Sequence, residues 1–368
     1  MSVNGAGFSH PATSGYGARG SVLASASQVR DRLDLLTRQA STGRVADTYG
    51  GLGAGAATSL SLRPAITRIE AWQANSNAVQ GRMDVARSSL EQISAIASNF
   101  RARTADLNGL SSAMVDSVTA GARDALRTVA NLLNARYGDQ YVFSGQDSGT
   151  PPVPQADAIL QSGFYHEIAT AVASLDPNGA GATIATTLAT ATSNAVGTSP
   201  FSATLSQPAG ALDALAATVP VGDGRVVPVG ILASANAEAV SGGPGSTGSY
   251  IRDILRSLAT LGAMDSGQIN TAGFAALVAD TRSNLEGAIT ALNVDAGVLG
   301  DRQAAIRDGH ARLEETAIAL RGQVSDVEDV DMAETLSRLS LAQTQLQASY
   351  QLLAGLQSLS LTKYLSAG

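Results

Sequence analysis

Heptad patterns of nearly equal length lie toward both ends of this chain. Between residues 65 and 107, apolar residues recur in alternating steps of four and three, interrupted only by Ser76 and Thr104. Between residues 278 and 320, an apolar residue falls at every seventh position, which keeps one stripe on one side of a helix. The patterns predict two long helices. Their apolar positions are Ala65, Ile69, Trp72, Val79, Met83, Ala86, Leu90, Ile93, Ala97, Phe100 and Leu107 in the first, and Val278, Leu285, Leu292, Leu299, Ile306, Leu313 and Leu320 in the second.

Two shorter patterns lie outside the long ones, from Val22 to Ala40 and from Met332 to Leu353. Gly43 is a suitable stop for the first short helix, and Pro64 is expected to begin the first long one. Because the inner patterns match in length, and so do the outer ones, we expect nested antiparallel pairs. The predicted fold is mainly α: a rod of long antiparallel helices, resembling a coiled-coil bundle, formed by the N- and C-terminal arms, with an inserted β-containing lobe.

A segment of different composition separates the arms. Between Asp139 and Ser249 the chain is rich in Gly, Ala, Thr and Pro, and Arg225 is its only Lys or Arg. Apolar runs bounded by turn residues predict short strands at 137–145, 201–207 and 224–232. The expected segments are a flexible N-terminus and terminal helix (1–44), N-terminal rod helices (45–137), the inserted lobe (138–250), a C-terminal rod helix (251–325) and a C-terminal assembly helix (326–368).

Charge and composition exclude several classes of partner. The net charge is -7, Lys363 is the only lysine, and no basic run exists, so neither nucleic acid nor an anionic membrane surface is an expected partner. No run of about 18 apolar residues occurs, which argues against membrane insertion. The chain has no cysteine, so disulfides and thiolate metal sites are excluded.

The sequence contains no cluster of residues typical of a catalytic or metal-binding site. His10, His166 and His310 are far apart and lack a second ligand at metal-binding spacing. The acidic residues from Asp326 to Glu334 suit the start of the last helix, where the helix dipole favours negative charge. We therefore expect no catalytic residues, no cofactor and no metal. An enzyme housed in 146–250 and a cytoplasmic helical adaptor are the rival interpretations, but neither requires a chain whose two ends match.

Several segments resemble the bacterial flagellin superfamily in their order and separation. The resemblance covers roughly 22–145 and 273–365. The matching segments are QASTGR at 39–44, SLSLR at 59–63, YVFSG at 141–145, VLGDR at 298–302 and DVDMAE at 329–334, the last followed by Leu339, Gln343 and Leu346. Two departures from filament flagellins are the missing "I-N-T-N" opening and a Gly-rich loop at Gly50 in place of a "D-D-P-A-G" turn. The final LSLTKYL at 359–365 is more similar to the hook-associated protein 3 branch.

The resemblance implies a non-enzymatic structural subunit of the bacterial flagellum, most similar to those at the hook–filament junction, with the major filament flagellin as the alternative. It implies self-association and contact with other flagellar axial proteins, namely hook-associated proteins and flagellin. It also implies type III export and an export chaperone for the C-terminal region. The first twenty residues lack the charged start and apolar stretch of a secretory signal, so we expect an extracellular protein secreted without a cleaved signal peptide.

The outer helices are the expected site of assembly. Their heptad stripes are only partly apolar, so surface remains that neighbouring copies can cover. The predicted assembly interface consists of Val29, Leu33, Leu36, Leu336, Leu339, Leu346, Tyr350 and Leu353.

Overall fold

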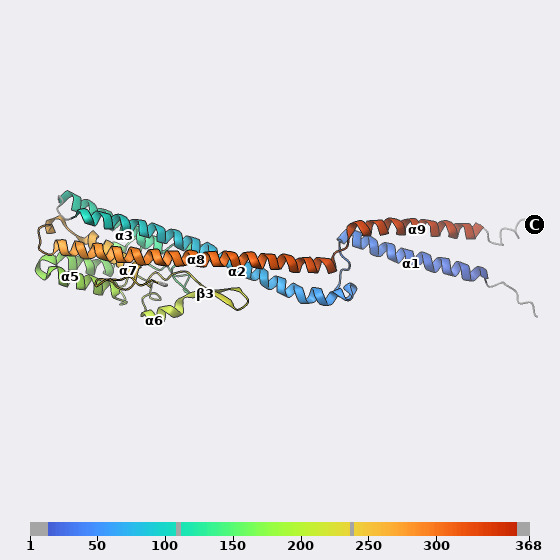
Figure 1. Ribbon diagram of the computed structural model, residues 1–368, viewed down its shortest axis with the longest axis horizontal. Helices are drawn as coiled ribbons and strands as arrows, with labels where there is room; N and C mark the ends of the chain where they lie inside the picture. Colours follow the sequence, from blue (N-terminus) through green and yellow to red (C-terminus); the bar gives the residue numbers. More distant parts are fainter. Residues whose placement is uncertain (1–13, 108–111, 236–238, 359–368) are drawn as a thin grey trace, which may run out of the picture. The chain divides into compact units, whose positions relative to one another are not determined.

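The computed structural model describes residues 14–107, 112–235 and 239–358 (Figure 1). The chain divides into two compact units. The terminal unit comprises Met1–Arg68 and Thr316–Gly368, and the central unit comprises Ile69–Glu315. Two long helices, α2 (Gly55–Asp106) and α8 (Phe274–Glu328), contribute residues to both units. The fold is mainly α, as the sequence predicted.

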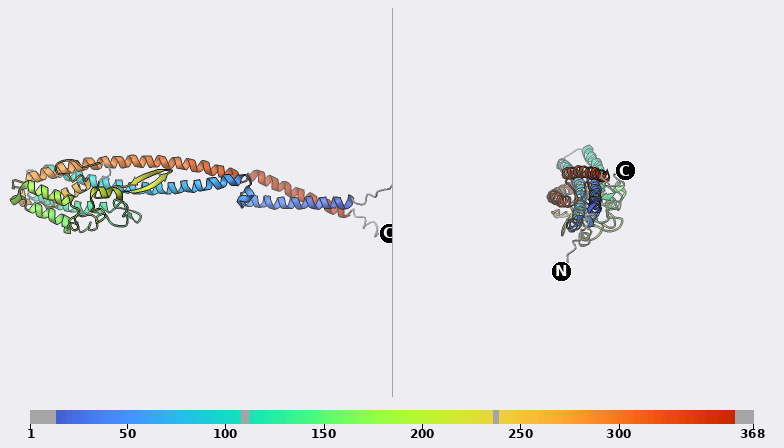
Figure 2. Two further views of the ribbon diagram at one scale, coloured as in Figure 1. Left: turned by 90° about the horizontal axis from the view of Figure 1, so that it is seen from below. Right: turned by 90° about the vertical axis from the view of Figure 1, so that its right-hand side faces the viewer.

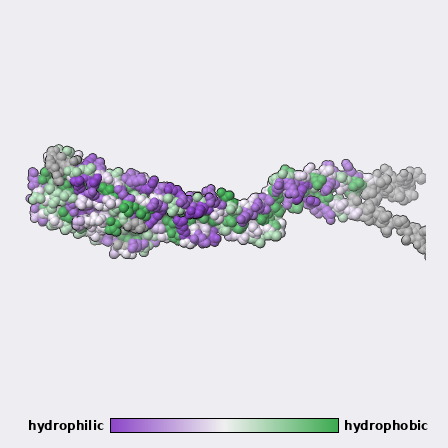
Figure 3. All heavy atoms as spheres, viewed as in Figure 1, coloured by the Kyte–Doolittle hydropathy of each residue, from purple (hydrophilic) through white to green (hydrophobic). Residues whose placement is uncertain are grey.

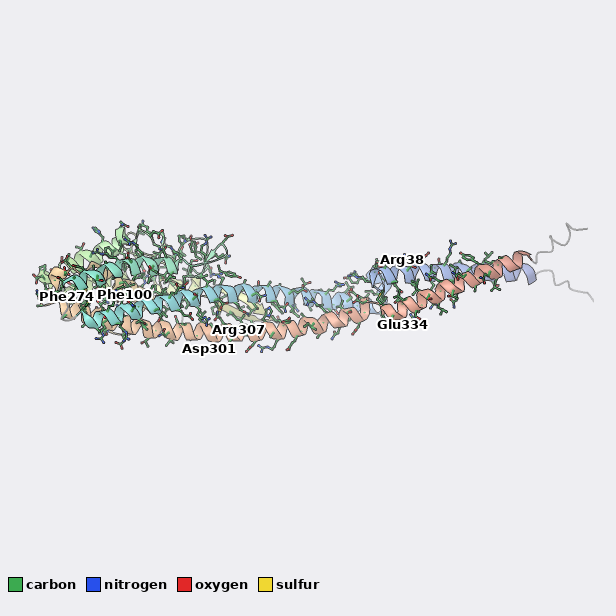
Figure 4. All side chains as sticks on the ribbon, turned by 90° about the horizontal axis from the view of Figure 1, so that it is seen from above. Arg38, Phe100, Phe274, Asp301, Arg307 and Glu334 are labelled. Carbon is green, nitrogen blue, oxygen red and sulfur yellow. The ribbon has the colours of Figure 1, made fainter. Side chains whose placement is uncertain are left out.

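In the central unit, α2 and α8 run antiparallel in one constant register. Asp84 Oδ1 accepts a hydrogen bond from Gln303 Nε2 at 2.9 Å, and Ser94 Oγ donates to Asn293 Oδ1 at 3.1 Å. Further along, Arg101 and Glu286 form an exposed ion pair at 3.9 Å. The two residue numbers in each pair add up to the same total, so neither helix slips against the other over this stretch. Phe100 and Phe274 lie at one end of this helix pair (Figure 4).

The predicted heptad positions form the seam between these helices. Every predicted position is buried from Ser76 on α2 to Leu107, which directly follows this helix, and on α8 the positions from Val278 to Ile306 are buried. The two hydroxyl residues in the α2 series are satisfied without a partner from outside the helix. Ser76 Oγ donates to the carbonyl of Trp72 at 2.8 Å, and Thr104 Oγ1 donates to that of Arg101 at 2.7 Å. Burial at these positions therefore leaves no hydroxyl unpaired.

The helix α7 (Tyr250–Ala263) lies at the centre of the core. Its residues from Tyr250 to Gly262 are all buried, and it packs against α3 (Ser112–Leu133), α4 (Gly163–Ala173) and α5 (Leu175–Thr192). From α8, Asn284 Nδ2 donates to Ser257 Oγ at 3.2 Å. Such complete burial requires that polar groups on α7 find partners.

Two arginines on α7 attach the lobe to this core. Arg252 binds carbonyls of the lobe, and Arg256 binds the carbonyl of Gly245 and, through Nε, Thr187 Oγ1 at 3.1 Å. Arg256 also pairs with Asp280 of α8 at 2.8 Å. Burial lowers the pKa of Arg256 and raises that of Asp280, and their ion pair opposes both shifts.

The inserted lobe contains less strand and more helix than the sequence suggested. Two antiparallel hairpins are present in its described part, one at 136–141 and one at 217–229. The expectation of a strand at 224–232 is confirmed for Arg225–Val229, whereas 201–207 forms turns. The hairpins consist of β1 (Arg136–Tyr137) with β2 (Gln140–Tyr141) and β3 (Ala217–Gly222) with β4 (Arg225–Val229). The short helical elements are η2 (Ile159–Gln161), α6 (Ala209–Leu212) and η3 (Asp213–Leu215) in the lobe, and η4 (Ser266–Gln268) between α7 and α8.

The helices α4 and α5 were not predicted. Their Ala- and Thr-rich sequence has no clear apolar period, and α5 is broken at Gly179, where φ is 75°. Packing of α4 and α5 against α7 outweighs these weak local preferences. A buried threonine series on α5, formed by Thr183, Thr187 and Thr190, supplies part of that contact.

The terminal unit pairs α1 (Ser14–Thr42) with α9 (Met332–Ser358), side by side in Figures 1 and 2. The 3₁₀ turn η1 (Tyr49–Leu52) leads into α2. The expectation that Pro64 begins the long helix is wrong, because α2 already begins at Gly55. A side chain at Gly55 would collide with Val327 of α8, so the missing Cβ lets the helix start against this neighbour.

The seam assignment predicts unequal effects of two substitutions on α8. Leu285→Ala removes a fully buried side chain and should lower the free energy of unfolding by about 2–5 kcal/mol. Val294→Ala removes an apolar side chain that is 52% exposed and should cost less than about 0.5 kcal/mol. Urea denaturation of both variants is the measurement. Equal losses would show that the seam has been placed on the wrong face.

Candidate functional site

The paired terminal helices meet along a thin seam. On α1, Ala26 and Leu36 are buried, and Val29, Leu33 and Ala40 between and beside them are half-buried. The facing positions on α9 follow the same four–three steps. They are Thr335, Leu339, Ala342, Leu346, Ser349 and Leu353, of which Thr335 and Ala342 are buried and the others half-buried. Small and partly exposed seam residues give this pair little buried apolar area.

Large apolar side chains on the other faces of α9 are exposed. Leu341 is 59% and Leu352 is 64% exposed, and Leu336 and Tyr350 are 51% and 46% exposed. In heptad terms, Leu336 and Tyr350 flank the seam on one side and Leu352 flanks it on the other, while Leu341 lies away from it. Figure 3 shows hydrophobic and neutral residues among the polar ones on the surface of this helix pair. Apolar groups on several sides of one helix are typical of a surface that another protein covers.

Charge is distributed unequally between the two helices. On α1 charged residues are frequent, with Arg30, Asp31, Arg32, Asp34 and Arg38 in nine positions. On α9 no charged residue occurs from Leu339 to Ser358. The exposed polar positions of α9 are instead Gln, Ser and Thr, which cost less than charges to remove from water.

The predicted interface residues fall into two groups. Val29, Leu33, Leu36, Leu339, Leu346 and Leu353 lie on the seam between α1 and α9. Leu336 and Tyr350 lie outside it and remain exposed. The assignment of all eight to an assembly interface stays a prediction.

Sequence reasoning missed other exposed apolar residues of the terminal helix pair. Among them are Leu23 and Leu35 on α1 and Leu341 on α9. These residues fall outside the four–three series, so a search for one seam passed over them. Leucines on the otherwise polar side of a helix were the available signal. The leucines at 359, 361 and 365 lie outside the described residues.

A short backbone pairing, which we call the clasp, joins the two links between inner and outer helices. The N–H of Val45 donates to the carbonyl of Glu328 at 2.7 Å, and the N–H of Val330 donates to that of Gly43 at 2.9 Å. Arg44 and Asp329 thereby form an isolated antiparallel bridge. Gly43 has a φ of 70°, which glycine adopts without strain and which turns the chain after α1.

Inside the clasp, the Glu328 carboxylate is bound by two residues of α2. It accepts hydrogen bonds from Ser59 Oγ and from Arg63, whose Nε lies 2.9 Å from Oε1. Glu328 is 7% exposed, whereas the Arg63 side chain remains 45% exposed. The hydrogen bonds from Arg63 and Ser59 hold the pKa of Glu328 below its usual range.

The acidic residues beside the clasp serve the helix ends. Asp331 Oδ1 accepts from the N–H groups of Ala333 at 2.8 Å and Glu334 at 3.1 Å, which caps α9 as the sequence suggested. Asp329 instead accepts from Ser325 at the end of α8, at 2.5 Å. Arg38 on α1 and Glu334 on α9 lie at this same end of the terminal pair (Figure 4).

The described residues contain no group of three His, Cys, Asp or Glu side chains that could hold a metal ion.

Tyr250 is a buried phenol whose pKa is raised by burial and by the charge of Asp295. It lies inside the core and donates a hydrogen bond to Asp295 Oδ2 at 3.0 Å. Searching the described helices for a stretch long and apolar enough to cross a membrane finds none.

Two family models match the chain. The model of the bacterial flagellin N-terminal helical region matches residues 16–148. The model of the bacterial flagellin C-terminal helical region matches residues 283–365. Together they cover more than half of the chain, including α1, α2, α3 and α9. No curated protein matches it.

The clasp predicts an acid-sensitive contact. The pKa of Glu328 is lower in the folded protein than the ordinary 4.5, so the unfolded chain takes up this proton first as the pH falls. Its stabilising effect is therefore complete at neutral pH and is lost as the pH drops below about 4.5 through the lowered pKa. The protection of the Val45 and Val330 amides, measured as their hydrogen exchange relative to an unfolded chain at the same pH, should decrease over that range.

Two variants isolate the contribution of Glu328. Glu328→Gln should accelerate hydrogen exchange of the Val45 and Val330 amides at neutral pH. In this variant, the protection of the two amides should no longer decrease in acid. Glu334→Gln, which takes one charge from an exposed ion pair with Arg338, should leave both amides unchanged. If the two variants behave alike, Glu328 does not hold the clasp.

Proposed function

The chain belongs to the bacterial flagellin superfamily, and from this premise we propose that it acts at the hook–filament junction, bound to its neighbours through α1 and α9. The family consists of structural proteins without enzymatic activity, and its members form the extracellular flagellar filament by polymerisation. The protein is accordingly a structural flagellar subunit and not an enzyme.

The exposed apolar residues of α9 are the observation that carries assembly through the terminal unit. Fully burying one leucine contributes roughly 1.5–3 kcal/mol. Burial of Leu336, Leu341 and Leu352 by neighbouring subunits would therefore supply a large part of the free energy of association. Because these residues lie on different sides of α9, a single neighbour cannot cover all of them. We therefore propose that each α9 contacts at least two other subunits.

The unequal charge of the two helices supports an orientation in the polymer. The uncharged stretch of α9 loses little solvation on burial, whereas the charged residues of α1 are better kept near water. We propose that α9 lies deeper in the assembly than α1. Val29, Leu33, Leu36, Leu339, Leu346 and Leu353 then hold α1 to α9, while Leu336 and Tyr350 contact neighbours.

Sequence features support the junction over the filament as the location. The segment 359–365 resembles hook-associated protein 3, and the Gly-rich loop at Gly50 departs from filament flagellins. In that position, the partners would be hook-associated proteins on one side and flagellin on the other. We also propose export without a cleaved signal peptide. An export chaperone would bind the C-terminal region, because the exposed leucines of α9 need protection before assembly. The alternative is the major filament flagellin.

Immunogold labelling of purified flagella separates these two locations. Label restricted to one ring beside the hook supports the junction. Label along the whole filament supports the filament flagellin and rejects the junction. Label on neither structure, with the protein retained in the cytoplasm, would reject both.

Charge on the exposed face of α9 should prevent assembly without unfolding the monomer. Leu336→Asp and Tyr350→Asp place a carboxylate where a neighbouring subunit is expected, a change that costs several kcal/mol once the site is buried. Ser337→Asp, at an exposed polar position, is the matched control and should assemble normally. Sedimentation measures assembly, and thermal melting should be unchanged in all three monomers. Normal assembly of Leu336→Asp and Tyr350→Asp would exclude this face.

The thin seam predicts that α1 and α9 are the least stable helices of the monomer. Ordering costs about 1–2 kcal/mol per residue in backbone entropy, and the small seam residues offset less of it than the buried leucines of α2 and α8 do. Amide exchange in a verified monomer should be fast in α1 and α9 and slow at 76–104 and 278–306. Slow exchange in α9 before assembly would mean that the terminal pair is stable by itself.

A further inference from the structure

A cavity of about 340 Å³ lies in the central unit, beside the N-terminus of α7. Its walls come from the end of α5, the turn η3, the segment at 234–235 and the first turn of α7. The residues that matter for its chemistry are Thr192, Gln207, Asp213, Ser234, Ser249 and Arg252. These residues lie outside both flagellin family matches, so the structural role of the family does not account for them.

Arg252 is a buried cation whose partners are all neutral. It is 7% exposed, and its Nε donates to the carbonyl of Ser234 at 3.0 Å. Nη1 donates to the carbonyls of Ala191 and Ser193, and Nη2 donates to Asn194 Oδ1 at 2.7 Å. The guanidinium also lies over a ring, 5.1 Å from the centroid of Phe201.

Among the described residues, no carboxylate forms a hydrogen bond or ion pair with Arg252. The neighbouring Asp253 uses its oxygens for Ser241, Ser246 and Thr247. Burial lowers the pKa of Arg252 to about 10, so the group remains charged at neutral pH. A guanidinium has five N–H groups. The four bonds above leave one N–H of Nη2 without an acceptor in the described part of the chain.

Ser234 lines the same cavity, and its hydroxyl is buried there. It is 3% exposed, and its Oγ has no hydrogen-bond partner among the described residues. A buried polar atom without a partner is costly, and a missing ligand or water is one common explanation. Ser234 and Arg252 thus combine a donor hydroxyl with a buried positive charge at one wall.

We propose that this cavity binds a small carboxylate that also carries hydroxyl groups, about the size of a hexose. The single cation matches one negative charge, and a charge-assisted hydrogen bond from Nη2 would hold the carboxylate. Thr192, Gln207 and Ser249 offer hydrogen bonds to hydroxyl groups of the ligand. The exposed Asp213 on the cavity wall disfavours a second negative charge, which argues against a phosphate. The volume lies in the range of small-molecule sites.

Calorimetric titration of the monomer with three probes tests the ligand class. Glucuronate should bind saturably with one site. Glucose lacks the carboxylate and acetate lacks the hydroxyl groups, so each should bind at least about tenfold more weakly, the loss expected for one charge-assisted hydrogen bond or a few neutral ones. Absence of saturable binding of glucuronate overturns the proposal. Glucose binding as tightly as glucuronate would overturn the role of the Arg252 charge.

Conservative variants locate the site without disturbing the lobe anchor. Ser234→Ala should weaken glucuronate binding several-fold at an unchanged melting temperature. Asp213→Asn should strengthen glucuronate binding and allow inorganic phosphate to bind. Asp223→Asn, in the exposed turn between β3 and β4, removes the same charge elsewhere and should change neither affinity. Wild-type affinity in both Ser234→Ala and Asp213→Asn would place any binding outside this cavity.

Discussion

The constant antiparallel register of α2 and α8 is the constraint on which the central unit depends. A seam of single large residues at heptad spacing tolerates no slip, because a shift by one residue would turn apolar positions toward water. The cross-helix contacts of Gln303, Asn293 and Glu286 add polar pairs that match only in this register. With the register fixed, one side of α8 faces α7, and α7 in turn supports α3, α4 and α5.

The lobe contains carboxylates but almost no Lys or Arg to pair with them. Because Arg225 is the only Lys or Arg between residues 139 and 249, few ion pairs are available within this region for its carboxylates. Hydroxyl groups replace them: Asp147 accepts from Thr150 and Thr204, and Glu167 accepts from Thr190 and Thr198. A Thr- and Ser-rich composition, which looked like a sign of strands and loops, thus supplies hydrogen-bond donors to these carboxylates. The two buried arginines of α7 supply the main positive charge from outside the lobe.

Sequence periodicity predicted the long helices well, because burial along a single seam requires an apolar residue at every third or fourth position. The acidic residues at the start of the last helix and the glycine stop at Gly43 were expected on a different ground, the local chemistry of helix ends, and Asp331 and Gly43 are found in these roles. The start of α2 was placed too late at Pro64, because the close approach of Gly55 to Val327 is invisible in a single sequence. The helices α4 and α5 and the contacts of Arg252 depend on tertiary packing. Leu341 was missed because it belongs to no seam within the monomer.

The pairing of α1 with α9 joins segments almost at opposite ends of the chain, which gives this contact the largest sequence separation in the molecule. Contacts of such high contact order form late, since the intervening chain must first become compact for the ends to meet at a modest entropic cost. During synthesis, which proceeds from the N-terminus, α1 also has no partner until nearly the whole chain has been made. The order of folding therefore follows from topology: the central unit can form early, and the terminal helix pair is completed last.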